Sequence, residues 1–475
     1  MLHQWCRTTL EPAMKDAETA LDTIAAISTP PGRGGIGIVR LSGPRAAEIA
    51  AQLVALRQPM EHAHARLADV LDPEDAEGAR IDEAMVTYFA GPHSYTGDDL
   101  VEIASHGSPV VLNLLLRRAM ELGARLAEPG EFTQRAFLAG KLDLTQAEAV
   151  RDLIDAQTLT QARQAASQMG GALSRRVQPV KQSLVELIAL MEAGIDFAED
   201  DVEVTAQAEI ARRIHKLDPP LAALEATFQR GRLVHDGMTL AIVGRPNAGK
   251  SSLFNRLAER ERAIVTATPG TTRDLVTERI SLEGIPLELV DTAGLREACE
   301  EAEQMGVARS REALAEAALV LVVLDATQPL NDEERGLLAD VAGRPALVAI
   351  NKCDLAGSDA VKADLKAAEL AGIAALQTSA LTGEGIGALR ERIVQLATGG
   401  AAAEPGMLTS LRHQQAIATA RSALRDAAKA NESGIPHEMI LMDLYRALWA
   451  LDSLTGQTTP DDILNLIFST FCIGK

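Results

Sequence analysis

One glycine-rich run in the middle of the chain has the residue types that bind phosphate. Residues 244–251 read Gly-Arg-Pro-Asn-Ala-Gly-Lys-Ser, which fits the phosphate-binding pattern G-x-x-x-x-G-K-[ST]. An apolar run at 238–243 precedes it and a helix-like run at 251–257 follows, so we expect a strand, a loop and a helix. In such a loop Lys250 reaches the β- and γ-phosphates and Ser251 can bind Mg²⁺. The predicted nucleotide contacts are Asn247, Ala248, Gly249, Lys250, Ser251 and Ser252.

Three further motifs indicate which nucleotide is bound. Residues 291–294 read Asp-Thr-Ala-Gly after an apolar run, and they suit Mg²⁺ and a γ-phosphate. Residues 351–354 read Asn-Lys-Cys-Asp, and the Asp354 carboxylate can accept two N–H groups of guanine that adenine cannot offer. Residues 378–380 read Thr-Ser-Ala after another short apolar run, and they can present a backbone N–H to the guanine carbonyl oxygen. Each motif alone could be an ordinary turn, but together and in this order they predict a GTP-binding domain. The further predicted contacts are Asp291, Gly294, Asn351, Lys352, Asp354, Ser379 and Ala380.

The position after Gly294 bears on hydrolysis. Some GTPases place a Gln there to orient the attacking water, but this chain has Leu295, which cannot do so. We therefore expect the water to be held by another group, and acidic residues are frequent over 297–303.

Asn247 leaves two interpretations open. It makes a hydrogen bond within the loop, or it binds a monovalent cation that does the electrostatic work of an arginine finger.

The composition limits the class of protein. A chain of 475 residues, 47% hydrophobic and 24% charged, is expected to fold into two to four globular domains. Its net charge of −20 argues against a dominant nucleic-acid-binding surface, although it leaves room for a local basic patch. If RNA is a substrate, we expect another subunit to carry most of the phosphate contacts. Four scattered cysteines, no bilayer-spanning apolar run and no apolar signal core predict a cytoplasmic location and no membrane association.

Local composition divides the chain into five parts. Residues 1–21 are expected to be a disordered extension, and 22–140 mix strand-like and helix-like runs as in an α+β domain. Residues 141–235 and 398–475 have helical spacing, whereas 236–397 alternate near-continuous apolar strands with helices. An example of the helical spacing is the apolar stripe of Val180, Leu184, Leu187, Ile188 and Met191. We expect strands at 23–28, 35–41, 99–103, 287–290, 318–324 and 346–350, and helices at 45–55 and 108–122.

The motifs together resemble one family, the tRNA modification GTPases called MnmE or TrmE. The resemblance rests on residues 244–251, 270–274, 291–297 and 351–354 in the expected GTP-binding domain. It extends to residues 30–40, 94–97, 129–137, 141–148 and 471–475, so it covers roughly 22–475.

The resemblance implies a multidomain fold. It consists of an N-terminal α+β domain for tetrahydrofolate binding and dimerisation, a helical domain built from two segments, and a Ras-like P-loop GTPase domain inserted between them. It also implies a homodimer that works with the flavoprotein MnmG (GidA), which carries FAD, in a heterotetramer or larger complex. The implied activity is potassium-stimulated GTP hydrolysis. The implied product is an aminomethyl or carboxymethylaminomethyl group on the wobble uridine of certain tRNAs, made with a 5-formyl or methylene tetrahydrofolate.

The resemblance also assigns roles to individual residues. Glu303 is implied to fix the attacking water, and Lys250 and Cys472 are implied to act in catalysis. The implied potassium ligands are Asn247, Thr266, Thr268 and Thr271, and the implied Mg²⁺ ligands are Ser251, Thr272 and Asp291. Thr266 and Thr272 are also implied to contact GTP. The implied folate contacts are Arg40, Glu102, Lys141 and Lys475. Ala267 and Pro269 depart from the family pattern, which leaves the strength of potassium activation open.

Two other functions remain open at this point. A ribosome-assembly GTPase shares the GTP-binding motifs, but such proteins usually carry a basic RNA-binding module, which the net charge disfavours. A non-catalytic GTP-dependent scaffold would bind the nucleotide without hydrolysing it.

Overall fold

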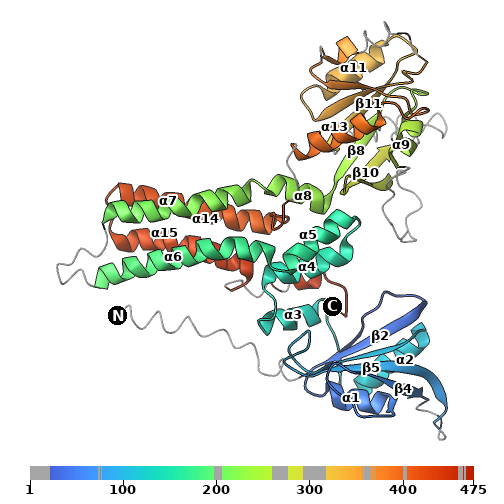
Figure 1. Cartoon of the computed structure of the whole chain (residues 1–475), viewed down its shortest axis with the longest axis vertical. Coiled ribbons are helices and arrows are strands. Elements are labelled where there is room, and N and C mark those ends of the chain that lie inside the picture. The colour runs from blue at the N-terminus through green and yellow to red at the C-terminus, as the bar shows by residue number, and fades with distance from the viewer. Residues whose placement is uncertain are drawn as a thin grey trace, which may run out of the picture. The chain divides into compact units, whose positions relative to one another are not determined.

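The computed structural model describes residues 22–72, 75, 78–196, 206–258, 277–291, 317–355, 357, 365–369, 371–399, 404–457, 464 and 467–474. The chain forms two compact units, one of Met1–Glu148 with Thr455–Lys475, and one of Ala149–Leu454. Figure 1 shows the sheets and helices of each unit. The expected combination of an α+β part, a helical part and a P-loop α/β part is confirmed.

The first unit is built on a sheet with the strand order β3-β4-β5-β6-β2-β1-β7 among its described residues. Helices α1 and α2 cover one face, where Ile49 and Leu115 are buried with Val39 and Ile103 of the sheet. Helix α3 borders the other face, where Phe132 is buried beside Ile24 of β1. The elements are β1 (Ile24–Ile27), β2 (Gly34–Ser42), α1 (Ala46–Leu53), β3 (Ala55–Leu56), β4 (Ala65–Leu71), β5 (Arg80–Phe89), β6 (Leu100–Gly107), α2 (Pro109–Glu121), β7 (Arg125–Leu126) and α3 (Glu131–Leu138).

The C-terminal tail completes this unit. Ile473 forms an antiparallel bridge with Pro129, and the Gly130 N–H donates to the Cys472 carbonyl oxygen at 3.4 Å. The Ser28 hydroxyl donates to the Gly474 carbonyl oxygen at 3.1 Å, across 446 positions of sequence. The tail therefore lies beside the end of β1, the first strand along the chain.

The helical part of the second unit combines two distant segments, as expected. In Figure 1, α7 and α14 lie side by side, and both share a buried core with α6 and α15. The predicted stripe of α6, from Val180 to Met191, is buried in this core together with Leu217 of α7 and Leu424 of α14. The helices are α4 (Leu144–Asp155), which begins in the first unit, α5 (Leu159–Met169), α6 (Ala172–Asp196), α7 (Gln207–Glu225), α8 (Phe228–Asp236), α14 (Leu411–Glu432) and α15 (His437–Thr455).

The second sheet has the strand order β13-β12-β11-β8-β10-β9 among the described residues, and only β9 runs antiparallel to its neighbour. Both faces are buried, which explains the near-continuous apolar runs. Because β8, β11 and β12 are parallel, the loops that follow them meet at one edge. The elements are β8 (Met238–Val243), α9 (Lys250–Ala258), β9 (Thr277–Leu282), β10 (Ile285–Asp291), β11 (Leu319–Asp325), α11 (Asp332–Val341), β12 (Ala346–Asn351), β13 (Ala374–Gln377) and α13 (Ile386–Thr398).

Within the described ranges, we find no helix with both the length and the hydrophobicity required for a membrane span.

Candidate functional site

The glycine-rich loop follows β8 and leads into α9, as its sequence predicts. Gly249 has a φ of +91°, and a β-carbon added there would lie 2.2 Å from the Asn351 side-chain nitrogen. Asn247 has a φ of +62°, a left-handed conformation that an asparagine tolerates better than most residues. The Lys250 side chain is buried, and its ammonium group donates to the carbonyl oxygens of Gly244 and Arg245 at 2.8 Å each. The loop is therefore closely packed around its own backbone.

Asn351 joins three of the predicted motifs. It ends β12 and is only 1% exposed. Its side-chain nitrogen donates to the Ala248 carbonyl oxygen at 3.0 Å, and its side-chain oxygen accepts from the Ala380 N–H at 3.0 Å. The phosphate loop, the 351–354 motif and the 378–380 motif are thus held together by one buried amide, whose nitrogen and oxygen both have partners.

The other predicted residues of these motifs differ in their contacts and in their exposure to solvent. The Lys352 ammonium donates to the Asn247 carbonyl oxygen at 2.7 Å. Ser379 is buried and its hydroxyl accepts from the Thr382 N–H at 3.1 Å, which stabilises the turn that presents Ala380. Asp354 is exposed, which leaves its carboxylate accessible to a base. Ser251 and Ser252 begin α9 and are also exposed.

Sequence reasoning missed an acid at the same edge. Asp325 ends β11, is 2% exposed, and forms an ion pair with the Lys352 ammonium at 2.7 Å. Burial alone would raise the pKa of the Asp325 carboxyl, but hydrogen bonds from Lys352 and Thr327 outweigh it and hold the pKa below its usual value. A signal was present in the sequence, because Asp325 follows a continuous apolar run just as Asp291 and Asn351 do.

A second missed pair supports the phosphate loop. The Arg245 guanidinium lies 3.2 Å from the Glu334 carboxylate, and these side chains are 13% and 2% exposed. Glu334 also accepts from the Asn331 N–H in the capping box that begins α11. The loop is thereby tied to a helix that no nucleotide-binding motif includes.

Several predicted site residues lie outside the described residues. They are Thr266, Thr268, Thr271, Thr272, Gly294, Glu303 and Lys475, and the side chain of Asp291 is also outside the description although its main chain ends β10. The extension over 1–21 and the departures Ala267, Pro269 and Leu295 also lie there.

The first unit holds the predicted folate contacts. Arg40 of β2 and Glu102 of β6 are register partners, and the guanidinium Nε donates to the carboxylate at 3.0 Å. The Arg40 guanidinium also donates to the Gly474 carbonyl oxygen at 3.4 Å. It lies 6.0 Å from the ring centre of Tyr95 and 5.6 Å from that of Phe132. The Arg40 guanidinium is therefore held by a carboxylate, by the C-terminal tail and by two aromatic rings.

Lys141 and Cys472 lie outside the contacts that surround Arg40. The Lys141 ammonium donates to the carbonyl oxygens of Pro92, at 2.6 Å, and of Ser94. Lys141 therefore contacts the 92–98 loop, and the structure gives no contact between its ammonium group and Arg40. Cys472 is exposed on the tail, two residues before the Gly474 that Arg40 contacts.

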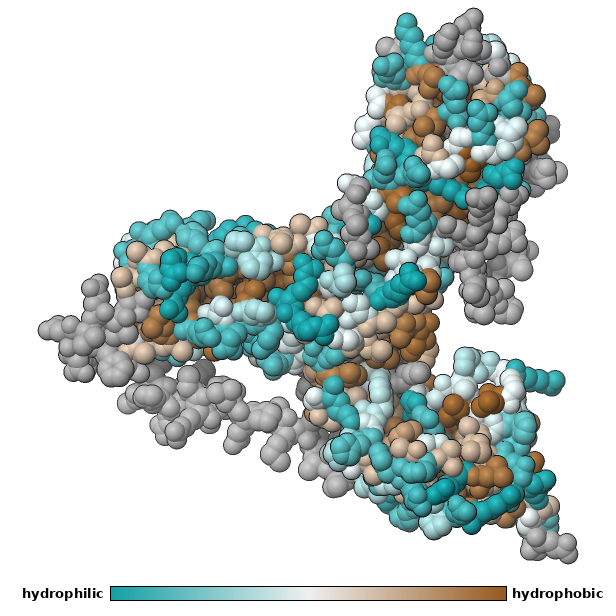
Figure 2. Space-filling model, in the orientation of Figure 1, coloured by the Kyte–Doolittle hydropathy of each residue, from teal (hydrophilic) through white to brown (hydrophobic). Residues whose placement is uncertain are grey.

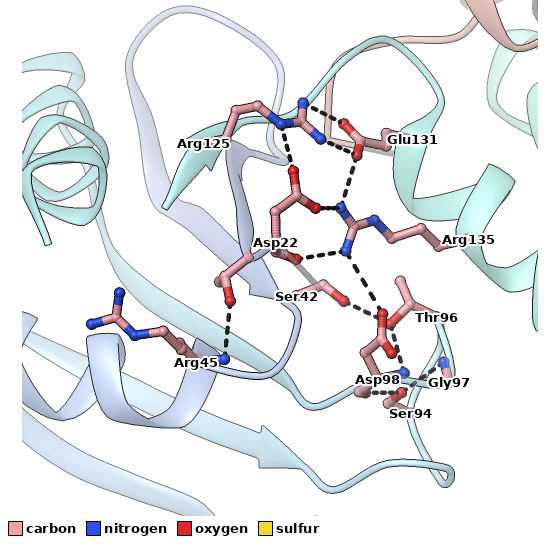
Figure 3. Close-up of polar contacts among 11 residues, drawn as sticks. Asp22, Ser42, Arg45, Ser94, Thr96, Gly97, Asp98, Arg125, Glu131 and Arg135 are labelled. Carbon is pink, nitrogen blue, oxygen red and sulfur yellow. Dashed lines mark hydrogen bonds and ion pairs between the residues drawn. The ribbon is translucent and has the colours of Figure 1, made fainter. Parts of the chain in front are cut away.

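An ion-pair network stabilises the loop that Lys141 contacts (Figure 3). Asp22 pairs with Arg125 at 2.7 Å and with Arg135 at 2.5 Å, and both arginines also pair with Glu131, at 2.6 and 3.0 Å. Arg135 extends the network to Asp98, at 3.7 Å. Burial would raise the pKa of the Glu131 carboxyl, but hydrogen bonds led by that from Arg125 hold it below its usual value. The network thus joins α3 to the end of the 92–98 loop.

Comparisons with known proteins agree over almost the whole chain. The family model described as the GTP-binding protein TrmE N-terminus matches residues 23–141, and the model of the MnmE helical domain matches residues 144–472. The tRNA modification GTPase MnmE of Koribacter versatilis is 56% identical over 459 residues, which cover 96% of this chain and 99% of that protein. The MnmE of Aquifex aeolicus is 40% identical over 455 residues, which cover 96% of this chain and 100% of that protein.

Two solved structures are similar to parts of the chain. The G domain of the FeoB iron transporter of T. maritima is 27% identical, with a TM-score of 0.25, and covers 34% of this chain and 98% of its own. A variant of Era from Aquifex aeolicus, bound to GDP and AlF4−, is 24% identical, with a TM-score of 0.28, and covers 39% of this chain and 66% of its own. The relatives align over nearly all of this chain, and one family model matches more than half of it. The chain therefore belongs to the MnmE (TrmE) family of tRNA modification GTPases.

Proposed function

We propose that this protein is a potassium-stimulated GTPase that acts, with a FAD-containing partner, in the modification of the wobble uridine of certain tRNAs. The observation that carries the nucleotide part is the buried Asn351 amide, which joins the phosphate loop to both guanine motifs. The tRNA part is supported by family membership. We further propose the division into 22–140, 141–235, 236–397 and 398–475 as folate, helical, GTPase and helical segments.

The phosphate loop fits a nucleotide and its Mg²⁺. Gly249 lets the Asn351 amide approach the loop closely, because an added β-carbon would lie 2.2 Å from its nitrogen, and the Ser251 hydroxyl stands at the first turn of α9. Ser251, Thr272 and Asp291 would hold Mg²⁺, which neutralises charge on the β- and γ-phosphates. Lys250 would contact the same phosphates, and Glu303 would orient the attacking water. An E303A variant that binds GTP normally but hydrolyses it at the wild-type rate would remove that role from Glu303.

Asn247 is the proposed potassium ligand, together with Thr266, Thr268 and Thr271. Its left-handed backbone, held by the Lys352 ammonium on its carbonyl oxygen, fixes where the side chain starts. A potassium ion there would supply positive charge beside the phosphate bridge. We expect GTP hydrolysis to be faster in KCl than in NaCl at equal ionic strength, and an N247A variant to lose this difference while retaining GDP binding. Equal and negligible rates of the wild type in both salts would instead favour a scaffold without catalysis.

The first unit is the proposed site of the tetrahydrofolate derivative, with Arg40, Glu102, Lys141 and Lys475 as contacts. The cation of Arg40 suits the glutamate carboxylates of folate, and Glu102 can accept from the pterin amine and ring N–H. The 5-formyl and methylene forms remain the two candidates. Cys472 is proposed to act in the modification, and this is supported by its position two residues before Gly474, whose carbonyl oxygen accepts from Arg40.

A homodimer through the first unit is the proposed assembly. Leu67 and Met85 are register partners on β4 and β5, and they are 39% and 42% exposed on the sheet face opposite the α1–α2 core. Figure 2 shows hydrophobic residues reaching the surface of this unit. The further proposed partners are MnmG, in a heterotetramer or larger complex that supplies FAD, and tRNA, in the cytoplasm.

Mass spectrometry of tRNA nucleosides from a deletion strain tests the proposed function. We expect the wobble uridine to lose the aminomethyl or carboxymethylaminomethyl group, and the wild-type gene to restore it. Fully modified wobble uridines in the deletion strain, with purified protein that co-sediments with ribosomal subunits, would favour a ribosome-assembly GTPase instead.

A further inference from the structure

We infer that Asp325 is a positioning residue for guanine-nucleotide binding, which acts by fixing Lys352 against the phosphate loop. Asp325 ends β11 and lies 26 positions before Asn351. It therefore belongs to none of the nucleotide-binding motifs. The inference deepens the proposed guanine-nucleotide site and rests on it.

The Lys352 ammonium has two acceptors from different parts of the chain. It donates to the Asp325 carboxylate at 2.7 Å and to the Asn247 carbonyl oxygen at 2.7 Å. A lysine side chain loses rotamer entropy when it is fixed in one conformation. The buried carboxylate offsets this loss before any nucleotide binds, so the hydrogen bond to Asn247 is already in place.

Asp325 is itself held in one orientation. Its second carboxylate oxygen accepts from the Thr327 N–H at 3.0 Å and from the Thr327 hydroxyl at 2.6 Å. The parallel register of β11 and β12 places Asp325 opposite Asn351, the residue before Lys352. Lys352 has a φ of +64°, an unusual conformation for a lysine that must be stabilised by its contacts.

A second contact connects Asp325 to the same loop. The Arg245 guanidinium donates to the Asp325 carbonyl oxygen at 3.4 Å. Asp325 therefore touches the phosphate loop through its main chain and, by way of Lys352, through its side chain. The two contacts hold Arg245 and Asn247, which lie in the phosphate loop shortly before Gly249.

Positioning and simple charge predict opposite effects of removing the carboxylate. By Coulomb's law, the loss of a negative charge near the site would favour an anionic nucleotide and slow its release. If Asp325 acts by fixing Lys352, the same change releases the ammonium and the loop, and the nucleotide dissociates faster. The sign of the change therefore separates the two explanations.

The test measures release of a fluorescent GDP analogue from the full-length protein by stopped flow. We expect D325N to release it about 10-fold faster, which corresponds to about 1.4 kcal/mol. In a K352M background, where the ammonium is absent, we expect D325N to add little, because the two residues act as one unit. The matched control is D340N, which removes an equal charge from an exposed position on α11.

Two outcomes would overturn the inference. One is unchanged or slower release from D325N, and the other is an equally large effect of D325N in the K352M background. If D325N does not fold, T327V decides instead, because it keeps every charge and removes only a hydrogen bond that orients Asp325; no acceleration there would reject the inference. A wild-type protein that binds no GDP at all would reject the proposed nucleotide site itself.

Discussion

The side chain of Asn351 donates a hydrogen bond to the carbonyl oxygen of Ala248, 103 positions earlier in the chain, at 3.0 Å. The bond is buried, so water cannot replace it at either end. It brings the two motifs into contact directly above Gly249, where no β-carbon fits. The guanine motif therefore limits what the phosphate loop can contain.

We predict that G249A weakens GDP binding by about 100-fold or more, which is about 3 kcal/mol. The added β-carbon would lie 2.2 Å from the Asn351 nitrogen, which cannot move without losing its buried hydrogen bonds, and the φ of +91° is strained for alanine. Isothermal titration with GDP measures the change. The control is G372A, at a φ of +71° with no atom within 4 Å, for which we expect nearly unchanged binding.

We predict that D354N exchanges guanine for xanthine specificity. The exposed Asp354 carboxylate can accept from the ring N–H and the exocyclic amine of guanine, whereas an asparagine amide can donate to the carbonyl that xanthine carries instead. Affinity for GDP should fall by about 100-fold or more, and affinity for XDP should rise correspondingly. Competition between the two nucleotides measures both, and a variant that still prefers GDP would remove the assigned role of Asp354.

We predict a pH dependence of stability from His235, at the end of α8. Its ring lies 3.2 Å from the Asp152 carboxylate and 2.7 Å from that of Asp236. The hydrogen bond that the ring donates to the Asp152 carboxylate, followed by the other carboxylate contacts, raises the pKa of His235 to about 9. Because the folded pKa lies above the unfolded value, the stabilisation is fully present below about pH 6.5 and is lost as the pH rises through 9.

The measurement for His235 compares calorimetric unfolding of the wild type and H235Q at pH 6.5 and 9. The wild type should lose at most roughly 3 kcal/mol more than the variant over this range. Identical pH profiles of the two proteins would show that the histidine does not change its charge in this window.

We predict that G474A weakens binding of 5-formyltetrahydrofolate by about 10-fold and leaves GDP binding unchanged. Gly474 has a φ of +95°, and an added β-carbon would lie 2.8 Å from the Ile27 carbonyl oxygen. The tail must then shift and withdraw its carbonyl oxygen from Arg40. The control is G434A, which has a φ of +68° and open space around it. Equal folate affinity of the two variants would separate the tail from the proposed site.

Continuous apolar runs and helical spacing made parts of the fold predictable. The strands β11 and β12 and the buried stripe of α6 were read directly, because burial on both faces or on one helical face leaves a local pattern. The strands β4 and β5 were missed. Their outward positions mix Leu67 and Met85 with charged residues such as Asp69 and Glu83, which obscures the alternation.

In the candidate sites, residues within sequence motifs were predictable and residues outside them were not. The phosphate loop and the guanine motif have fixed local spacings, so their residues were identified, whereas Asp325 was not, because a single acid after a strand is usually a turn residue. The contact between Ser28 and Gly474 has no local pattern at all. Only the resemblance to a family indicated that the two ends of the chain share a site.

The bond between Ser28 and Gly474 also sets an order of events on the ribosome. At about 5–20 residues per second, the 446 positions between them take about 20 to 90 s to translate. During this interval the first sheet can form, but Arg40 lacks the tail carbonyl that it contacts in the finished protein. The proposed folate site of the first unit is therefore completed only after the GTP-binding part has been synthesised, and a nascent or truncated chain lacks this contact.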